Sequence, residues 1–542
     1  MLPKILIIGL DGADPKLIES WTAAGHLPNI AGLLTRGVYS RLRSSIHPIT
    51  PSAWSTFLTG KNAGKHGIYN FVSLRGDGYG TQYTNGGFLA GSTFLQQCSE
   101  AGMRVGAFEI PWTYPPVALN GYTVTGLDAP SLDRSLANPP EIFDEIVREV
   151  GPYSLRSVWR EGDDRVYDLK GHLGEFDKRI AAVNYLFRRH PTDISMIVFQ
   201  ATDTVQHLFF RDRQITTKEG EQVEDVILHT YMHVDRHVGQ LLEQYTDDQT
   251  TVVLLSDHGG QPCERFFNLK RWMIEAGYTQ IAVGRQSARR FRGALRRTLK
   301  SMVPAAVRQK LLARRGINWT MPEAEADWEQ TRAFCWGSYG NIQINVQGRQ
   351  ANGIVPPDQV EQLCQQIAAE LLEIVDPTTG QRPVAQVLTG AELYHGPLAA
   401  EAPDLLVVAT DGYEIRTGME PEQPLSVDPM DSSQTGNPPF GGTHAYHGIL
   451  GLVGPHITAG ASVDDPWLAD LAPTLLYLAG LPVPEDMDGR VLEEVLDSQL
   501  LAERPLQQVT DQQAEVQERQ TQPYSEEQAA EIEKRLQDLG YF

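Results

Sequence analysis

The sequence predicts an α/β protein: a three-layer α/β/α sandwich around a largely parallel sheet, with a smaller α+β cap inserted into it. Two patterns lead to this fold class. Residues 4–8 form a short run that is rich in β-branched residues and lacks alternation, which is typical of a parallel strand buried on both faces. Similar runs recur with helical stretches between many of them, as expected of a parallel sheet covered on both faces. These runs are residues 104–109, 194–199, 251–255, 404–408 and 449–453.

The opening strand ends in Gly9-Leu10-Asp11-Gly12, and Asp14 then precedes Pro15. Asp14 is suited to cap a helix whose first residue is Pro15. Asp11 stands at the carboxyl end of the strand, where open α/β sheets bind their ligands. We therefore interpret Asp11 as a candidate ligand-binding residue, and the alternative is a turn residue before the helix.

The length of 542 residues allows two to four domains, or one large α/β domain with insertions. We predict an α/β core in two parts, residues 1–265 and 401–500, with the cap insertion at 266–400. Residues 501–542 are predicted to be a tail that is disordered at 506–522 and ends in a helix over 524–539, with Ser525 as its cap.

Within the insertion, residues 285–315 contain eleven arginine and lysine residues and no acidic residue. The simplest interpretation is a solvated face of the insertion. The alternative is that this segment supplies the cations that an anionic substrate or a lipid surface would need.

The formal net charge is −22, which argues against binding to a nucleic-acid polymer. A small anionic substrate would then need local cations, either basic side chains or metal ions. The four cysteines contain no C-x-x-C pair and lie far apart, so they indicate neither a thiolate zinc site nor a disulfide framework. A reducing, cytoplasmic setting fits. We find no apolar run of the ~18 residues that a membrane span needs and no secretion signal.

Two further acids follow predicted strands. Asp203 comes after the strand at 194–199 and lies four residues before His207, so the two side chains would share one face of a helix. Asp257 and His258 directly follow the strand at 251–255. Because the carboxyl ends of parallel strands meet at one edge of the sheet, these residues are candidates for the same site as Asp11.

A glycine-rich loop at 441–448 adds His444 and His447 just before the strand at 449–453. Three acids and three histidines without a thiolate suit zinc or manganese. Six ligands are too many for one open tetrahedral site, and they fit two sites whose metals lie about 3.5–4 Å apart. Such a pair stabilises both the attacking and the leaving oxygen of a phosphoryl transfer.

Thr50 lies between Pro48 and Pro51, and Pro51 suits the first position of a helix. Thr50 is therefore predicted at the N-cap, where its hydroxyl could contribute about 1 kcal/mol of stability and nothing more. Next to the metal ligands we favour a second interpretation. A divalent cation would activate the hydroxyl as a nucleophile, and the free N–H groups of the helix start would meet a phosphate oxygen.

These motifs together resemble the alkaline phosphatase superfamily, specifically its branch of type I phosphodiesterases and nucleotide pyrophosphatases. The resemblance runs from near residue 1 to about residue 490, in the order of the family. It rests on Gly9-Leu-Asp11-Gly, Thr50-Pro-Ser-Ala-Trp-Ser-Thr-Phe-Leu-Thr59-Gly60, Asp203-x-x-x-His207, Ser256-Asp257-His258-Gly259 and Gly442-Thr-His444.

The resemblance implies an alkaline phosphatase-like fold with two divalent metal ions, zinc first and manganese second. One metal would be held by Asp11, Thr50, Asp257 and His258, and the other by Asp203, His207 and His444, with His447 as the reserve for His444. Thr50 would also be the catalytic nucleophile and form a phosphothreonine. The chain departs from the nucleotide pyrophosphatases at Ala53, where they carry an asparagine that binds a phosphoryl oxygen. Lys61, Asn62, Lys65 and His66 are nearby candidates for the missing donor.

We therefore predict a metal-dependent hydrolase of phosphate esters, with phosphodiesters first and monoesters second. A phosphomutase would use the same phosphothreonine and pass its phosphoryl group to another hydroxyl. The alternative outside the enzymes is a metal-containing binding protein with little or no catalytic turnover. His229, His233 and His237, spaced four residues apart, are predicted on the solvated side of a helix and outside the site.

Overall fold

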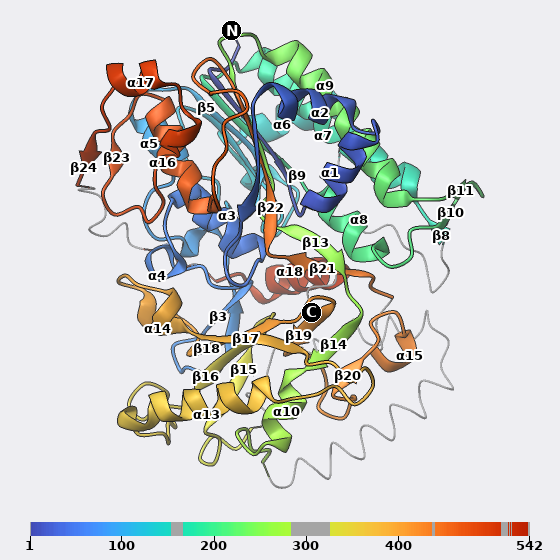
Figure 1. Ribbon diagram of the computed structural model, residues 1–542, viewed down its shortest axis with the longest axis vertical. Helices are drawn as coiled ribbons and strands as arrows, with labels where there is room; N and C mark the ends of the chain where they lie inside the picture. The colour runs from blue at the N-terminus through green and yellow to red at the C-terminus, as the bar shows by residue number, and fades with distance from the viewer. Residues whose placement is uncertain are drawn as a thin grey trace.

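The computed structural model describes residues 2–152, 166–282, 326–435, 439–510, 519, 521 and 523–539. The basic segment at 285–315, and with it the predicted contact to an anionic or lipid partner, lies outside the described residues. Two lobes make up the described chain: a larger one built on an eight-stranded sheet and a smaller one with sheets of its own (Figure 1).

The large sheet is parallel at its centre and antiparallel at its edges. From β12 to β6 the neighbouring strands run parallel, while β2, β22 and β7 are antiparallel to their neighbours. The order across the sheet is β2 (Val38–Arg43), β22 (His447–Val453), β12 (Thr251–Leu255), β1 (Ile5–Leu10), β9 (Ile194–Phe199), β5 (Val105–Ile110), β6 (Gly121–Thr125) and β7 (Ala137–Asn138).

Helices cover both faces of this sheet, which confirms the predicted three-layer architecture (Figure 1). Strand β1 shows why its sequence is apolar throughout. Leu6 and Ile8 pack into the core on one face, and Ile5 and Ile7 pack into the core on the other. The first face carries α1 (Pro15–Ala23), α2 (Pro28–Arg36), α6 (Glu141–Val150), α7 (Leu169–Arg189), α8 (Ala201–Phe209) and α9 (Val226–Tyr245). The second carries α3 (Thr50–Thr59), α5 (Phe94–Glu100), α16 (Leu471–Leu478) and α17 (Ser498–Glu503).

The smaller lobe lies beyond one end of the large sheet (Figure 1). Its core packs α10 (Leu269–Glu275) and α13 (Val360–Leu372) against a four-stranded antiparallel sheet. That sheet has the order β15 (Ala333–Trp336), β16 (Asn341–Ile344), β18 (Leu405–Ala409) and β17 (Val384–Thr389). A second, three-stranded sheet has the order β19 (Tyr413–Arg416), β14 (Arg265–Asn268) and β20 (Ser426–Val427).

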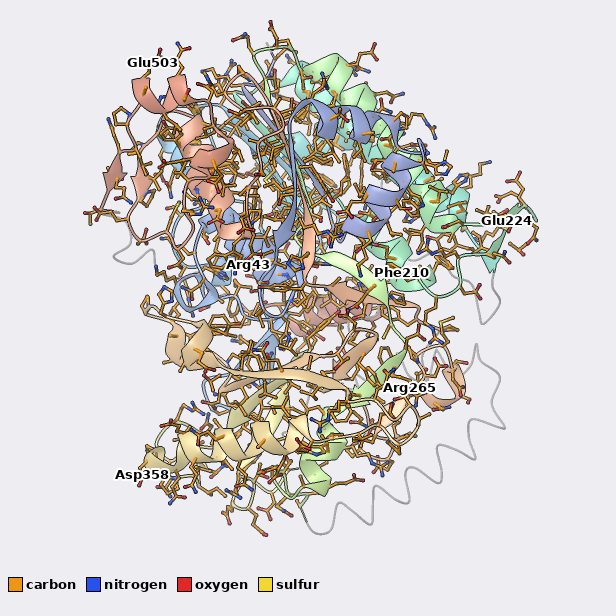
Figure 2. The ribbon with its side chains drawn as sticks, in the orientation of Figure 1. Arg43, Phe210, Glu224, Arg265, Asp358 and Glu503 are labelled. Atoms are coloured by element: carbon orange, nitrogen blue, oxygen red, sulfur yellow. The ribbon has the colours of Figure 1, made fainter. Side chains whose placement is uncertain are left out.

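Strand β18 corresponds to the strand predicted at 404–408, but it pairs with β16 and β17 in the smaller lobe. The sequence placed residues 401–500 in the core, and an apolar strand does not by itself indicate which sheet it joins. We propose that the second part of the core begins near β21 (Gly442–Ala445). Figure 2 shows the two lobes meeting through their side chains, with Phe210 on the larger lobe and Arg265 on the smaller one.

The remaining elements are short, apart from one helix near the end of the chain. They are α4 (Ala63–His66), β3 (Val72–Leu74), β4 (Thr81–Tyr83), β8 (Val166–Tyr167), β10 (Ile215–Thr217), β11 (Gln222–Val223), β13 (Gly259–Pro262), α14 (Gly390–Leu393), α15 (Ser432–Thr435), β23 (Val483–Pro484), β24 (Gln508–Val509) and α18 (Glu526–Asp538). Within the described ranges, no helix has the length and apolar character that crossing a bilayer requires.

The tail is partly structured. Strand β24 lies inside the stretch predicted to be disordered and pairs with β23, while residues 511–518, 520 and 522 of that stretch lie outside the described residues. Helix α18 begins after Ser525, whose side chain and that of Gln528 form a reciprocal capping box. Its apolar face packs into a core cluster that also contains Trp112 of the larger lobe and Trp336 of the smaller one.

Arg535 fixes α18 to the larger lobe. Its buried guanidinium donates to the carbonyl oxygens of Leu127 and Ala129 at 2.7 and 2.6 Å. We expect Arg535→Ala to lower the free energy of unfolding by about 3 kcal/mol, because two buried carbonyls lose a charged donor. The urea midpoint of unfolding measures this. Lys534→Ala, at the exposed neighbouring position, is the control, and equal midpoints for the two variants would contradict the assignment.

Candidate metal centre

The three acids predicted as ligands meet because their strands are neighbours. Strand β1 lies between β12 and β9, and all three run parallel. Asp11 follows β1, Asp257 follows β12, and Asp203 lies in the first turn of α8, just after β9. Their carboxylates therefore meet at the carboxyl edge of the sheet, and all three are at least 95% buried.

The histidines reach this edge by two routes. His207 follows Asp203 by one helical turn in α8, so the two side chains share a face. His258 follows Asp257, and β13 then pairs with β21, which carries His444. As a result the rings of His258 and His444 stack with centroids 3.7 Å apart.

Two overlapping groups of potential ligands result. In the first, Nε2 of His258 lies 3.6 Å from Oδ1 of Asp11 and 3.4 Å from Oδ2 of Asp257. In the second, Oδ1 of Asp203 lies 3.2 Å from Nε2 of His207 and 3.7 Å from Nε2 of His444. His258 is near both groups, since its ligand atom also lies within 4.8 Å of those of Asp203 and His444. The two groups are therefore adjacent parts of one centre.

The backbone orients all three imidazoles in the same way. Nδ1 of His207, His258 and His444 lies 3.3, 3.0 and 2.6 Å from the carbonyl oxygens of Gly442, Gly259 and Pro48, respectively. A carbonyl oxygen only accepts, so these contacts favour the tautomer with the proton on Nδ1, in which Nε2 is available as a ligand atom. These Nε2 atoms converge on one another and on carboxylates, with Nε2 of His207 only 2.9 Å from Nε2 of His444. Nitrogen and carboxylate ligand atoms gathered in this way would be held together by a cation between them.

Unpaired buried atoms lead to the same conclusion. Oδ1 of Asp11, Oδ2 of Asp257 and Nε2 of His258 are fully buried and lack a hydrogen-bond partner among the residues that the structure describes. Each such atom would cost about 1–3 kcal/mol if it stayed unsatisfied. Coordination to divalent ions would satisfy all three, so the donor set fits metals, and oxygen and imidazole donors suit zinc or manganese.

The electrostatics also favour a cation. Burial, reinforced by the other carboxylates, raises the pKa of Asp11 well above its usual value, and burial does the same for Asp257. Burial alone would raise the pKa of Asp203, but the attraction of His207 outweighs it and holds this pKa low. Burial opposes a charged His207, and the carboxylate of Asp203 nevertheless raises its pKa. A divalent cation at the centre would favour the charged form of Asp11 and Asp257, which burial alone disfavours.

Thr50 is placed next to this centre by two contacts of its segment. Nδ1 of His444 donates to the carbonyl oxygen of Pro48, and the indole of Trp54 in α3 lies 3.4 Å from Oδ2 of Asp11. Thr50 is buried and is the first residue of α3. The predicted N-cap at Thr50 was wrong by one residue. Ile49 is the N-cap, because its backbone is extended and its carbonyl oxygen accepts the first helical hydrogen bond, from Ala53.

Some residues named from the sequence lie elsewhere. His447, the reserve ligand, is exposed at the start of β22 and belongs to neither ligand group. Lys61 and Lys65, considered as phosphate donors, form ion pairs with Asp486 and Asp488, respectively. Asn62 caps α4 with its side chain.

The sequence interpretation missed residues that shape the centre. Tyr339 of the smaller lobe stacks on His444, with ring centroids 5.3 Å apart, and Phe440 stacks on His207 at 4.9 Å. No local pattern around these aromatic residues indicates a site.

Gly12 also shapes the centre, and its sequence signal is a glycine directly after Asp11. Its N–H donates to Asp257 at 3.2 Å, its φ is +66°, and a Cβ there would lie 2.7 Å from Oδ1 of Asp203. Only glycine fits at that position.

The comparison with protein families gives one match. The model of the family described as Type I phosphodiesterase / nucleotide pyrophosphatase matches residues 5–447. This range includes β1, α3, α8 and β21, and thus every residue of the two ligand groups. A comparison with curated proteins gives no match.

Solved structures of a phosphonoacetate hydrolase share the fold at low sequence identity. Phosphonoacetate hydrolase from Sinorhizobium meliloti 1021, in complexes with phosphonoformate and with phosphonoacetate, is 14% identical and superposes with a TM-score of 0.54. The match covers 88% of this chain and 96% of the hydrolase. Human ectonucleotide pyrophosphatase / phosphodiesterase 5 is 13% identical with a TM-score of 0.49, over 91% of this chain and 100% of the human one.

Proposed function

Because the chain belongs to the type I phosphodiesterase / nucleotide pyrophosphatase family of metal-dependent phosphoric ester hydrolases, we propose that it hydrolyses small phosphodiesters with Thr50 as nucleophile at a two-metal centre. One metal would be held by Asp11, Thr50, Asp257 and His258, and the other by Asp203, His207 and His444. The observation that carries this proposal is the convergence of three histidine Nε2 atoms and three buried carboxylates beside the start of α3.

Each group then has a defined task. Two divalent cations would favour the alkoxide of a coordinated hydroxyl and neutralise charge on the phosphoryl oxygens. The Thr50 oxygen attacks phosphorus in line with the ester oxygen, which leaves, and a phosphothreonine forms. Water then attacks the phosphothreonine and releases the phosphate monoester with Thr50 restored. The first N–H groups of α3 are available to the phosphoryl oxygens.

The proposed metals and substrates follow from the donors and from the family. Three imidazole and carboxylate donors per site suit zinc better than magnesium or calcium, and manganese is the second choice. The family description supports diesters over monoesters. Ala53 supplies no side-chain donor to a phosphoryl oxygen, so we propose that the metals and the backbone of α3 carry this role.

We also propose a reducing, cytoplasmic setting. The four cysteines are buried free thiols in the structure, and burial raises the pKa of the Cys98, Cys335 and Cys364 thiols to about 12. Such thiols are unreactive and persist where disulfides are kept reduced.

An ester panel tests the proposed activity. We expect the zinc- or manganese-loaded protein to have a higher kcat/KM for bis(p-nitrophenyl) phosphate, a diester, than for p-nitrophenyl phosphate, a monoester. The reverse order would make the protein a monoesterase. A protein that cleaves neither, with its metals bound, would instead support the binding-protein alternative.

Oxygen-18 water separates hydrolysis from transfer. A hydrolase that uses a phosphothreonine incorporates one labelled oxygen into each phosphoryl product, because water attacks phosphorus in the second step. A phosphomutase passes the phosphoryl group to an acceptor hydroxyl, so its product would carry no label. Mass spectrometry of the phosphoryl product distinguishes the two outcomes.

A further inference from the structure

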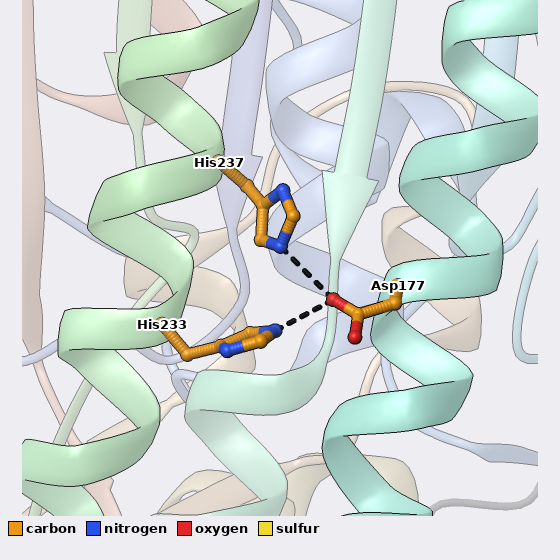
Figure 3. Close-up of side chains that lie close together, drawn as sticks. All are labelled: Asp177, His233 and His237. Carbon is orange, nitrogen blue, oxygen red and sulfur yellow. Dashed lines mark hydrogen bonds and ion pairs between the residues drawn. The ribbon is translucent and has the colours of Figure 1, made fainter.

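A second cluster of potential ligands lies in the helical layer on one face of the large sheet, between α7 and α9 (Figure 3). In α9, His229, His233 and His237 recur at intervals of four residues, and the sequence predicted all three on the solvated side. That prediction was wrong for His233, which is only 8% exposed. The reason is that α7 packs along this side of α9, while His229, one turn earlier, is exposed.

The side chains of His233 and His237 point from α9 toward Asp177 of α7 (Figure 3). Nε2 of His233 lies 2.7 Å from Oδ1 of Asp177, and Nε2 of His237 lies 2.9 Å from the same oxygen. Phe176, the neighbour of Asp177, packs against both imidazoles with ring centroids 5.8 and 5.6 Å away. An apolar wall therefore holds both rings in place and excludes water from one side.

We propose that Asp177, His233 and His237 form a third metal site, which binds a divalent transition-metal ion such as Zn²⁺ and links α7 to α9. The three ligand atoms all lie within 4.8 Å of one another, and this group shares no residue with the catalytic centre. Two imidazoles one helical turn apart plus one carboxylate form a three-ligand set for zinc, with water as the fourth ligand. Magnesium and calcium prefer oxygen donors and would bind weakly here.

The geometry needs one small adjustment. A tetrahedral zinc ion with bonds of 2.0–2.2 Å holds its ligand atoms about 3.4 Å apart, so Asp177 would move back by roughly half an ångström. The side chain of Asp177 is 52% exposed, whereas those of His233 and His237 are 10% and 14% exposed. The mobile ligand is thus the carboxylate on the solvent side, which also leaves room for the water ligand.

Arg236 disfavours metal binding at this site, so replacing it tests the proposal. Its guanidinium lies 3.4 Å from Nδ1 of His233. Arginine only donates, so this contact favours the tautomer with the proton on Nε2, while metal binding needs that proton on Nδ1. Arg236 is exposed and is free to turn toward solvent when an ion binds. Arg236→Gln would remove the positive charge and supply a carbonyl oxygen that accepts from Nδ1.

The alternative is a hydrogen-bonded cluster in which both imidazoles donate to Asp177 and no ion binds. The two interpretations differ in metal content. We would dialyse the full-length chain against buffered free Zn²⁺ and measure zinc per chain by elemental analysis. We expect Asp177→Asn and His237→Ala each to bind one equivalent fewer than the wild type, whatever the number held at the catalytic centre. His229→Ala, on the same helix, is the matched control and keeps the wild-type number.

Two further measurements do not depend on catalysis. The difference spectrum of Co²⁺-loaded wild type minus Asp177→Asn should show the visible bands of a four- or five-coordinate site. Arg236→Gln should strengthen Zn²⁺ binding at this site by about tenfold. Equal zinc content in the wild type and Asp177→Asn, or unchanged affinity in Arg236→Gln, would overturn the proposal in favour of the hydrogen-bonded cluster. The catalytic proposal would be unaffected, because the ester panel tests it separately.

Discussion

Thr50→Ala is expected to lower kcat/KM for a phosphodiester by at least about 10⁴-fold. Alanine has no oxygen to attack phosphorus from the first position of α3, beside the candidate metal ligands. Steady-state kinetics with the metal-loaded variant measures the loss. Thr50→Ser keeps a hydroxyl at the same position, so we expect it to retain activity within about 10²-fold of the wild type.

A loss of activity must be separated from a loss of structure. Ser55→Ala is a matched control, because Ser55 lies in the same helix and its buried hydroxyl lacks a hydrogen-bond partner among the described residues. We expect its activity and thermal midpoint to match those of the wild type. In the wild type, acid quenching during turnover of a phosphodiester followed by mass spectrometry should detect the phosphoryl group, with its remaining ester, on the peptide that contains Thr50. Full activity of Thr50→Ala would exclude the proposed nucleophile.

The sequence was sufficient to predict that the candidate ligands meet at the carboxyl edge of the sheet. Each of Asp11, Asp203 and Asp257 follows an apolar run, and the rule that parallel sheets bind ligands beyond the carboxyl ends of their strands needs no knowledge of strand order. The order itself, with β1 between β12 and β9, depends on pairings between residues about 200 positions apart. No local pattern carries that information.

The features that the sequence did not predict have a common physical origin in tertiary packing. The apolar stripe of α9 indicated one buried side, but α7 covers a second side and buries His233. The run that became β18 indicated a strand correctly, and only pairing with β16 and β17 decided its sheet. Tyr339 reaches the centre from the smaller lobe, where it stacks on His444. Such residues are selected by three-dimensional contact, so their local sequence carries no sign of the role.

Removing the metals with a chelator is expected to abolish activity and to lower the thermal midpoint. Each ion that binds only the folded state contributes about 4 kcal/mol at a concentration 1,000-fold above its Kd. The metal-free chain also retains Asp11 and Asp257 as buried carboxyl groups whose pKa values are raised by burial. Differential scanning calorimetry of the stripped and reloaded protein measures the difference. An unchanged midpoint after complete removal of metal would contradict the proposed centre.

The sign of the pH dependence follows from these pKa shifts. Asp11 and Asp257 bind protons more tightly in the folded, metal-free chain than in the unfolded one, whose carboxyl pKa is about 3.9. Their contribution to stability is therefore present at low pH and is lost as the pH rises through the raised folded values. The raised pKa of His207 also makes the folded, metal-free chain less stable as the pH rises. The lowered pKa of Asp203 changes the stability only below about pH 4, where the unfolded chain takes up the proton, so it does not alter the pH dependence above that value.

Metal ions reverse this trend, because they bind the deprotonated ligands. The stabilisation gained on metal loading should therefore increase from pH 5 to pH 8. Asp257→Asn sharpens the test: it removes one buried carboxylate but keeps an acceptor for the N–H of Gly12. At pH 8 the metal-free variant should be more stable than the metal-free wild type by about 1–3 kcal/mol, although it binds metal poorly and is inactive. A variant that gains stability while losing function would show that Asp257 is kept for the metal and not for the fold.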